Sequence, residues 1–175
     1  MAKVENLEWN KLGRIAVFID AANVIYSCKS LGWHIKYERL RNYFKSHGKL
    51  VGISFYYAER EENIHDTKLF GALTNLGFFV RSRRVKIFKN ADGTIQVKGN
   101  VDGELIVDMI KSKDDYDTAF LLSGDSDFSY AADFLKTSGK KVFVVSTRNH
   151  VSRELIRASS GYFNLRDFKD DWSFL

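Results

Sequence analysis

Residues 118–128 read Thr-Ala-Phe-Leu-Leu-Ser-Gly-Asp-Ser-Asp-Phe, an apolar run followed at once by a short acidic loop. The run does not alternate with polar residues, which is typical of a strand covered on both faces in a parallel sheet. Two more runs, 15–19 and 142–145, have the same character. Between the runs, apolar residues recur at three- and four-residue steps, as at Leu105, Ile106 and Met109. This alternation predicts an α/β domain with a mainly parallel central sheet.

Other elements are predicted around these runs. Residues 48–57 and 78–80 indicate two further strands, and residues 64–76 a helix that ends near Gly77. Residues 84–98 depart from this alternation of strands and helices. Two segments in which polar and apolar residues alternate, 85–87 and 95–98, lie on either side of the turn-forming stretch 90–93. This pattern predicts an added β-hairpin with Lys86 and Lys98 on its outward face.

Length and composition fit one globular domain of 175 residues, with 45% hydrophobic and 28% charged residues. The single cysteine, Cys28, cannot form an internal disulfide, which favours a reducing compartment, and we expect the cytoplasm. The first residues lack an apolar signal segment, and no apolar run is long enough to span a membrane. We expect an N-terminal arm (1–13) that is loose, the domain itself (14–165) and an apolar tail (166–175). The tail is expected to dock on the domain or on a second copy, so a homodimer is one possibility.

The net charge of +5 is concentrated in one window of the chain. Between residues 81 and 98, six basic residues stand against one acid, Asp92. A local basic stripe suggests a polyanion partner, although a solvated hairpin face would have the same composition. The basic residues are Arg81, Arg83, Arg84, Lys86, Lys89 and Lys98.

Acidic residues follow the predicted strands at the edge where ligands bind in parallel sheets. Asp20 follows the first apolar run, Asp125 and Asp127 follow the run at 118–122, and Asp102 opens a helix that continues to about residue 112. Any one of them alone could be a helix cap. Together they predict a cluster of carboxylates that repel one another, and Mg²⁺ or Mn²⁺ would relieve the repulsion.

Asp108 stands six residues beyond Asp102. On a helix this separation is about 9 Å along the axis and roughly 120° around it. We therefore expect Asp108 to support the site or to face the substrate rather than to share the ion. Glu104 lies on the same helix face as Asp108 and is expected to be a solvated neighbour.

Three segments carry a family resemblance: Phe-Ile-Asp-x-x-Asn at 18–23, Lys-Gly-x-Val-Asp at 98–102 with Asp108, and Ser-Gly-Asp-Ser-Asp-Phe at 123–128. In this order they resemble the NYN-domain family, the LabA-like branch of the PIN-like nucleases, over residues 14–165. The resemblance implies a PIN-like three-layer sandwich and Mg²⁺- or Mn²⁺-dependent cleavage of RNA. The implied metal ligands and catalytic residues are Asp20, Asp102, Asp125 and Asp127. Asn23 would lie beside them, and Ser123 would hydrogen-bond a carboxylate or a phosphate.

The chain departs from the family pattern at two places. Ala21 and Ala22 stand where a glycine is frequent, and residues 159–161 read Ser-Ser-Gly where relatives tend to carry Ala-Asp. The second departure concerns local packing more than chemistry. The stretch Ser152-x-x-Leu155 again fits the late helix of the family.

The favoured hypothesis is a metal-dependent ribonuclease acting on RNA, expected to be single-stranded. In it, Arg83, Arg84, Lys86 and Lys98 would follow the RNA backbone. Three aromatic residues could stack on unpaired bases: Tyr56, Tyr57 and Phe88. The alternative is that they pack in the core, which is the role we expect for Phe88.

The main alternative is a non-catalytic RNA-binding or regulatory module on the same fold. The presence of all four aspartates argues against it. A phosphatase of the haloacid-dehalogenase type is disfavoured, because that chemistry needs a second aspartate two residues after the first and Ala22 stands there. Dinucleotide and Walker phosphate-binding loops are absent from the sequence, as are cysteine and histidine sets with zinc spacing.

Overall fold

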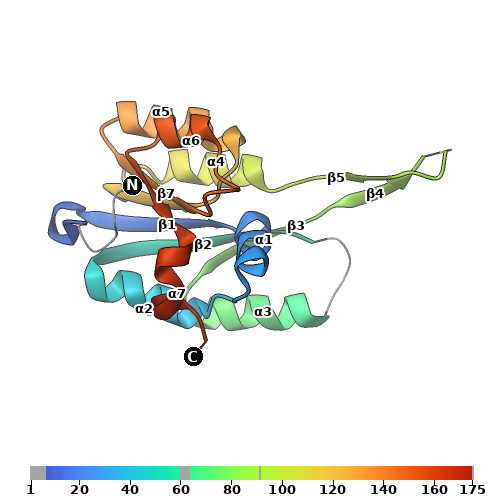
Figure 1. Ribbon diagram of the computed structural model, residues 1–175, viewed down its shortest axis with the longest axis horizontal. Helices are drawn as coiled ribbons and strands as arrows, with labels where there is room; N and C mark the ends of the chain where they lie inside the picture. The colour runs from blue at the N-terminus through green and yellow to red at the C-terminus, as the bar shows by residue number, and fades with distance from the viewer. Residues whose placement is uncertain (1–6, 60–63, 91, 175) are drawn as a thin grey trace.

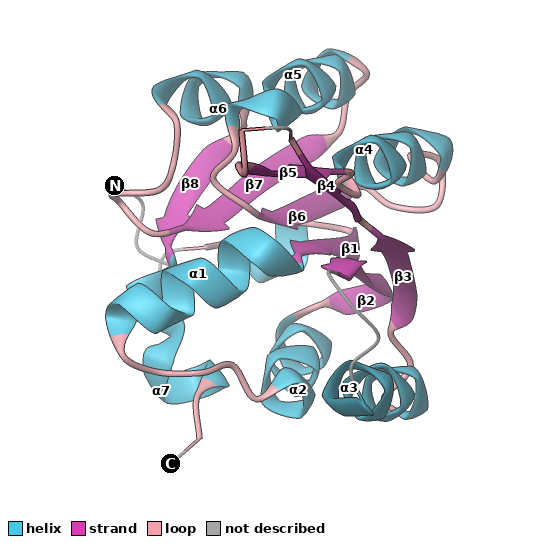
Figure 2. Cartoon of the chain, turned by 90° about the vertical axis from the view of Figure 1, so that its right-hand side faces the viewer, coloured by secondary structure: helices cyan, strands magenta, loops and turns pink. Residues whose placement is uncertain are grey.

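The computed structural model describes residues 7–59, 64–90 and 92–174, and shows three layers: helices, a central sheet, and helices again (Figures 1 and 2). The sheet has six strands, all parallel, in the order β3-β2-β1-β6-β7-β8. Their bounds are β1 Arg14–Asp20, β2 Lys49–Glu59, β3 Phe79–Arg84, β6 Thr118–Leu122, β7 Lys141–Ser146 and β8 Gly161–Asn164. The predicted α/β class and parallel sheet are confirmed.

Helices cover both faces of this sheet (Figure 2). One face carries α1 Ala21–Leu31, α2 Tyr37–His47, α3 Ile64–Asn75 and the short C-terminal α7 Lys169–Trp172. The other carries α4 Asp102–Lys111, α5 Ser129–Thr137 and α6 Arg153–Ala158. The helix predicted at 64–76 is α3, and Gly77 beyond it has a φ of +81°, the left-handed conformation of a helix terminus.

The core is divided in two by the alternation of side chains along β1. Ile15, Val17 and Ile19 pack towards α1 and α2, whereas Ala16 and Phe18 pack towards α4 and α5. Residues 15–20 are all buried, as expected of a strand in the middle of a covered parallel sheet.

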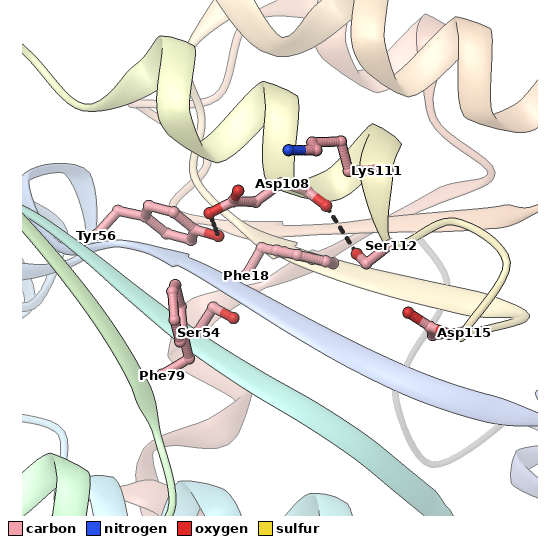
Figure 3. A pocket seen from close by; sticks show the side chains of 8 residues that line it. All are labelled: Phe18, Ser54, Tyr56, Phe79, Asp108, Lys111, Ser112 and Asp115. Atoms are coloured by element: carbon pink, nitrogen blue, oxygen red, sulfur yellow. Dashed lines mark hydrogen bonds between the residues drawn. The ribbon is translucent and has the colours of Figure 1, made fainter.

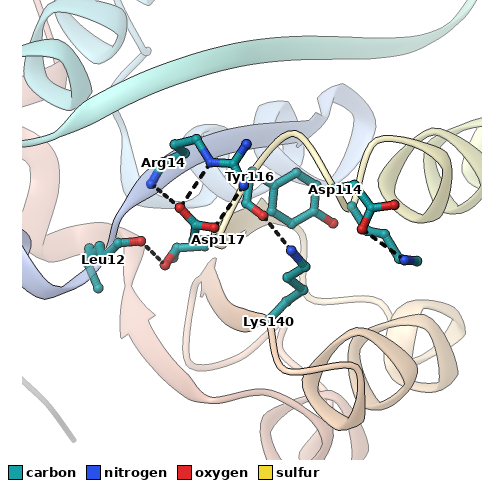
Figure 4. A network of polar contacts seen from close by, with 8 residues as sticks. Leu12, Arg14, Asp114, Tyr116, Asp117 and Lys140 are labelled. Atoms are coloured by element: carbon teal, nitrogen blue, oxygen red, sulfur yellow. Dashed lines mark hydrogen bonds and ion pairs between the residues drawn. The ribbon is translucent and has the colours of Figure 1, made fainter.

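A polar network fixes the start of β1 against β6 (Figure 4). The carboxylate of Asp117 accepts hydrogen bonds from the backbone N–H of Arg14 at 2.8 Å and from its Nε and Nη2 at 3.1 and 3.0 Å. Thr118 Oγ1 donates to the carbonyl of Leu12 at 2.7 Å. These contacts set the register in which the two strands deliver their acidic ends to the opposite edge of the sheet.

Both ends of the described chain pack on the domain. Residues 1–12 were expected to be a loose arm. For residues 7–12 this is wrong, because Leu12 is buried and the Trp9 ring stacks on Phe120 with centroids 5.7 Å apart; residues 1–6 lie outside the described part of the structure. The tail docks on its own domain, where Trp172 is fully buried and stacks on Phe168 at 4.0 Å. Because these tail side chains are already used internally, the argument they gave for a homodimer no longer holds.

The predicted hairpin is formed by β4 Lys86–Lys89 and β5 Ile95–Lys98, a separate two-stranded antiparallel sheet that extends away from the domain (Figure 1). Lys86 pairs with Lys98 in the register, and Lys86 is exposed. The side chain of Lys98 lies outside the described part of the structure. Among the described residues, helices long and apolar enough to cross a membrane are absent.

Candidate metal centre at the carboxyl edge of the sheet

Asp20 ends β1 and begins α1 at the same time. Its Oδ1 accepts a hydrogen bond from the backbone N–H of Asn23 at 3.2 Å, which caps the helix. Its Oδ2 accepts from Ser123 Oγ at 2.8 Å, at the end of the neighbouring strand β6. Asp20 is only 7% exposed, so its carboxylate joins α1 to β6 from beneath the surface. The expectation that Ser123 hydrogen-bonds a carboxylate is met here.

The loop after β6 is held in place by its own Asp125 and by Asn23 from α1, which in turn is bonded to β7. Asp125 Oδ1 accepts from the backbone N–H of Asp127 at 3.0 Å and so caps the 3₁₀ turn η3 Ser126–Phe128. Asn23 Oδ1 accepts from the backbone N–H of Gly124 at 3.1 Å and from Ser146 Oγ, at the end of β7, at 3.4 Å. Asn23 therefore positions the loop that carries Asp125 and Asp127.

Three of the four predicted ligands come together at this edge. Asp102, Asp125 and Asp127 each offer a carboxylate oxygen, and these oxygens all lie within 4.8 Å of one another. Asp102 is the first residue of α4, and Asn100 Nδ2 donates a short hydrogen bond to its Oδ2. Asp20 is not part of this close group, and its two oxygens accept hydrogen bonds from α1 and from Ser123.

The carboxylates act on one another electrostatically. Burial raises the pKa of Asp102 to about 6, and the charges of Asp20, Asp125 and Asp127 add to the shift. Burial also raises the pKa of Asp20, against the lowering effect of its hydrogen bonds from Asn23 and Ser123. A divalent cation would offset this repulsion. Since the donors are carboxylate oxygens, the set fits Mg²⁺ or Mn²⁺.

Asp108 and Glu104, further along α4, face strand β3 instead of the carboxylate group. Arg81 Nε and Tyr56 Oη each donate to Asp108 Oδ2 at 3.0 Å. Arg83 Nη1 donates to Glu104 Oε1 at 3.0 Å. Glu104 is thus an ion-pair partner of Arg83 and not merely a solvated neighbour.

Of the predicted RNA-binding side chains, Arg84 and Lys86 are exposed beside the root of the hairpin. The aromatic predictions need correction. Tyr56 is fully buried with its hydroxyl on Asp108, so it cannot stack on a base. Phe88 is 44% exposed, so its expected place in the core is wrong. Tyr57 is partly buried, and its ring packs edge-on against Phe70 at 5.4 Å.

The sequence reasoning missed the residues that support the site from the side of β7. The carbonyl of His150 lies so close to Gly124 that a Cβ there would meet it at 2.1 Å. The backbone N–H of Ser152 donates to the carbonyl of Gly124 at 2.9 Å. His150 Nδ1 is 3.1 Å from Ser27 Oγ on α1. The glycine between Ser123 and Asp125 was the only signal of this close approach.

Comparisons with known proteins agree with this geometry. The family model described as NYN domain matches residues 14–166. The chain is 32% identical over 160 residues to "Low amplitude and bright protein LabA" of Synechococcus elongatus, covering 89% of this chain and 86% of that protein. A crystal structure of a Vibrio parahaemolyticus protein of unknown function has a TM-score of 0.75 at 23% identity, covering 96% of this chain and 100% of that one. This last likeness concerns the fold.

Proposed function

The chain belongs to the NYN-domain family of PIN-like nucleases, and from that premise we propose that it is a metal-dependent ribonuclease. The observation that carries the proposal is the group formed by Asp102, Asp125 and Asp127, whose ligand oxygens lie within 4.8 Å of one another. Capping explains Asp125, but it does not explain why Asp102 and Asp127 converge on the same point. Like charges held within 4.8 Å repel one another, and a bound cation would offset that repulsion.

Asp102, Asp125 and Asp127 would hold Mg²⁺ or Mn²⁺, and Asp20 would stand close beneath them. A divalent cation bound there would supply an activated water at neutral pH and stabilise the charge on a phosphodiester. Asp20 keeps Ser123 and the N-terminus of α1 in register, because it accepts hydrogen bonds from both. Asn23 fixes the backbone of Gly124 and so orients the acidic loop.

RNA is the proposed substrate, in single-stranded form. The exposed basic side chains of Arg84 and Lys86 lie at the root of the hairpin, which continues from β3 and returns through β5 to Asp102. The basic side chains would attract the phosphate backbone, and a cation held by the carboxylates would offset their own repulsion of it. Arg83 would contribute only if its ion pair with Glu104 opened. The lone and buried Cys28 supports a reducing compartment such as the cytoplasm.

The test is cleavage of end-labelled single-stranded RNA with Mg²⁺ or Mn²⁺, next to an EDTA control. We compare the wild type with the double variant Asp125→Asn, Asp127→Asn. The matched control is Asp133→Asn, an exposed aspartate on α5 that pairs with Lys136. We expect metal-dependent cleavage that the double variant loses and the control keeps.

If the wild type binds RNA but does not cut it with either metal, the ribonuclease proposal fails and the non-catalytic RNA-binding module takes its place. If the double variant cuts as fast as the wild type, the carboxylate group is not the catalytic site.

A further inference from the structure

A pocket of about 310 Å³ lies between α4 and the strands β1, β2 and β3 (Figure 3). Phe18, Ser54 and Phe79 line it from three neighbouring strands and are partners in the parallel register. Lys111 and Ser112, at the end of α4, line the opposite side. Its size is within the range of sites that take small organic groups.

The pocket has a fixed hydrogen-bond acceptor. Tyr56 Oη and Arg81 Nε both donate to Asp108 Oδ2 at 3.0 Å, so the carboxylate is held in one orientation. Its second oxygen, Oδ1, accepts no hydrogen bond from any described residue, and Figure 3 shows this carboxylate among the lining groups. An acceptor presented in this way selects a ligand that brings an N–H donor.

The pocket also has an exposed aromatic wall. Phe79 is 53% exposed, although it is a large apolar residue at the start of β3. The guanidinium carbon of Arg81 lies 5.2 Å from the centre of its ring. An exposed ring beside a guanidinium plane is a stacking surface for a flat heteroaromatic group.

Its position relates the pocket to the carboxylate group. Asp20, Tyr56 and Arg81 are register partners at the acidic edge, and Phe18, Ser54 and Phe79 stand two residues earlier in each strand. Two residues along a strand span about 7 Å. Phe18 and Tyr56 also belong to the core on the α4 side, so the pocket opens on the sheet face that carries α4.

We propose that this pocket receives one unpaired nucleobase with an exocyclic amino group, from the RNA strand whose phosphate lies at the carboxylate group. The base stacks on Phe79, and its amino group donates to Asp108 Oδ1. The inference rests on the proposed function for the identity of the strand, but it is tested by binding and not by cleavage.

Two variants change the pocket without touching the carboxylate group. Phe79→Ala removes the exposed wall, and Ser54→Leu fills the floor from a strand position that is not fully buried. The matched control is Tyr130→Ala, which removes an aromatic ring that is 86% exposed on α5, outside the pocket. Circular dichroism and thermal unfolding establish that each variant is folded.

The readout is the Kd of a fluorescent single-stranded cytidine oligonucleotide, measured by anisotropy in EDTA so that no cleavage occurs. We expect Phe79→Ala and Ser54→Leu to weaken binding by about tenfold or more, the effect of losing one stacked base, and Tyr130→Ala to leave it unchanged. A change below twofold in both pocket variants, or a wild type that does not bind, overturns the inference. If the pocket variants lose binding but the wild type never cuts RNA, the inference about the pocket holds and only the ribonuclease proposal fails.

Base choice and strand origin are tested in the same assay. The wild type is expected to bind the cytidine oligonucleotide several-fold more tightly than one of N3-methyluridine, because the methylated base carries no N–H donor for Asp108. Ser54→Leu is expected to lose that preference, since it fills the pocket. Equal binding of the two oligonucleotides by the wild type contradicts the role of Asp108. If cytidine monophosphate binding depends on Ser54 while oligonucleotide binding does not, the site serves a free nucleotide and the RNA inference is wrong.

Discussion

The four aspartates have different structural roles, although the sequence alone does not distinguish them. Asp20 and Asp125 act as caps, and Asp20 is buried with both oxygens occupied by Asn23 and Ser123. Asp102 carries no capping hydrogen bond in α4, and its raised pKa of about 6 is the mark of a carboxylate held close to others. A bound cation would therefore favour the charged form of Asp102.

Replacing Asp102 by Asn should stabilise the metal-free protein above pH 6. Folded Asp102 keeps its proton up to about pH 6, whereas a carboxyl in the unfolded chain loses it near the ordinary value of 3.8. Between these values the folded state binds more protons, so the free energy of unfolding falls as pH rises. After allowance for solvent screening, we expect Asp102→Asn to be more stable than wild type at pH 8 by about 1 kcal/mol.

Urea unfolding in EDTA at pH 8 and pH 4 measures this difference, which should shrink at the lower pH. Addition of Mn²⁺ at pH 8 should reverse the order, since only the wild type retains the full set of ligands. A metal-free wild type that is more stable than the variant at pH 8 would contradict the prediction.

Gly124→Ala should disturb the site by steric contact alone. The new Cβ would lie 2.1 Å from the carbonyl oxygen of His150 and 2.7 Å from Ser146 Oγ. The loop must shift, which should cost about 2 kcal/mol and move Asp125 away from its partners. Thermal unfolding and the RNA cleavage assay measure both effects. Gly103→Ala in α4, where a Cβ meets nothing within 4 Å, is the control and should be neutral or slightly stabilising.

At the scale of elements, the apolar runs predicted the central strands, because a covered parallel strand has no polar alternation. The short outer strand β8, Gly161–Asn164, was not predicted. Runs 15–19, 118–122 and 142–145 became β1, β6 and β7. Pairing of side chains between elements was harder to predict. Arg81 and Arg83 lie two residues apart on β3, and Asp108 and Glu104 lie four apart on α4. Four residues rise about 6 Å along a helix and two residues about 7 Å along a strand, so the two spacings nearly match. The pairing could be predicted only once the strand and the helix were known to lie side by side.

The docked tail shows where the sequence was ambiguous. The apolar side chains at 168 and 172 must be buried, but composition does not show whether they pack on their own domain or on a second copy. The structure resolves this through α2, where Tyr43 and Phe44 pack edge-on or tilted against Trp172, each with centroids 5.8 Å apart.

Trp172→Ala should therefore destabilise the domain itself. The side chain is fully buried between α2 and Phe168, so its loss leaves a cavity that costs about 3 kcal/mol or more. Chemical unfolding followed by circular dichroism measures the change. Phe174→Ala is the control, because Phe174 is 65% exposed and its loss should matter little. If both variants unfold like the wild type, the tail does not contribute to the core.

At the scale of the whole molecule, charge is distributed unevenly. The window 81–98 holds six basic residues and one acid, which equals the net charge of +5 of the whole chain. Two of its arginines, Arg81 and Arg83, form ion pairs with acidic residues of α4. The basic surface proposed to bind RNA is therefore narrower than the sequence suggests.

The double variant Arg84→Gln, Lys86→Gln should weaken RNA binding at low salt and flatten its salt dependence. For single strands, each lost phosphate contact lowers the slope of log K against log salt by about 0.7, so two contacts give about 1.4. Anisotropy titrations at several salt concentrations give the slopes. The control is Lys45→Gln, Lys49→Gln, which removes equal charge from two exposed positions. These lie near the end of α2 and at the start of β2, away from the carboxyl ends of the strands. Equal slopes in the two double variants would mean that the effect is one of net charge only.

The outermost strand, β3, has a further consequence for how copies of the domain behave towards one another. A strand with only one neighbour, here β2, presents hydrogen-bonding groups that can template addition of a foreign strand. On β3 the positions after Val80 carry Arg81, Arg83 and Arg84. Charged side chains on an edge strand hinder the addition of another strand, even where they are paired as Arg81 and Arg83 are, so we expect these arginines to oppose self-association of concentrated protein. Replacing them to weaken the proposed RNA binding would at the same time remove this protection against aggregation.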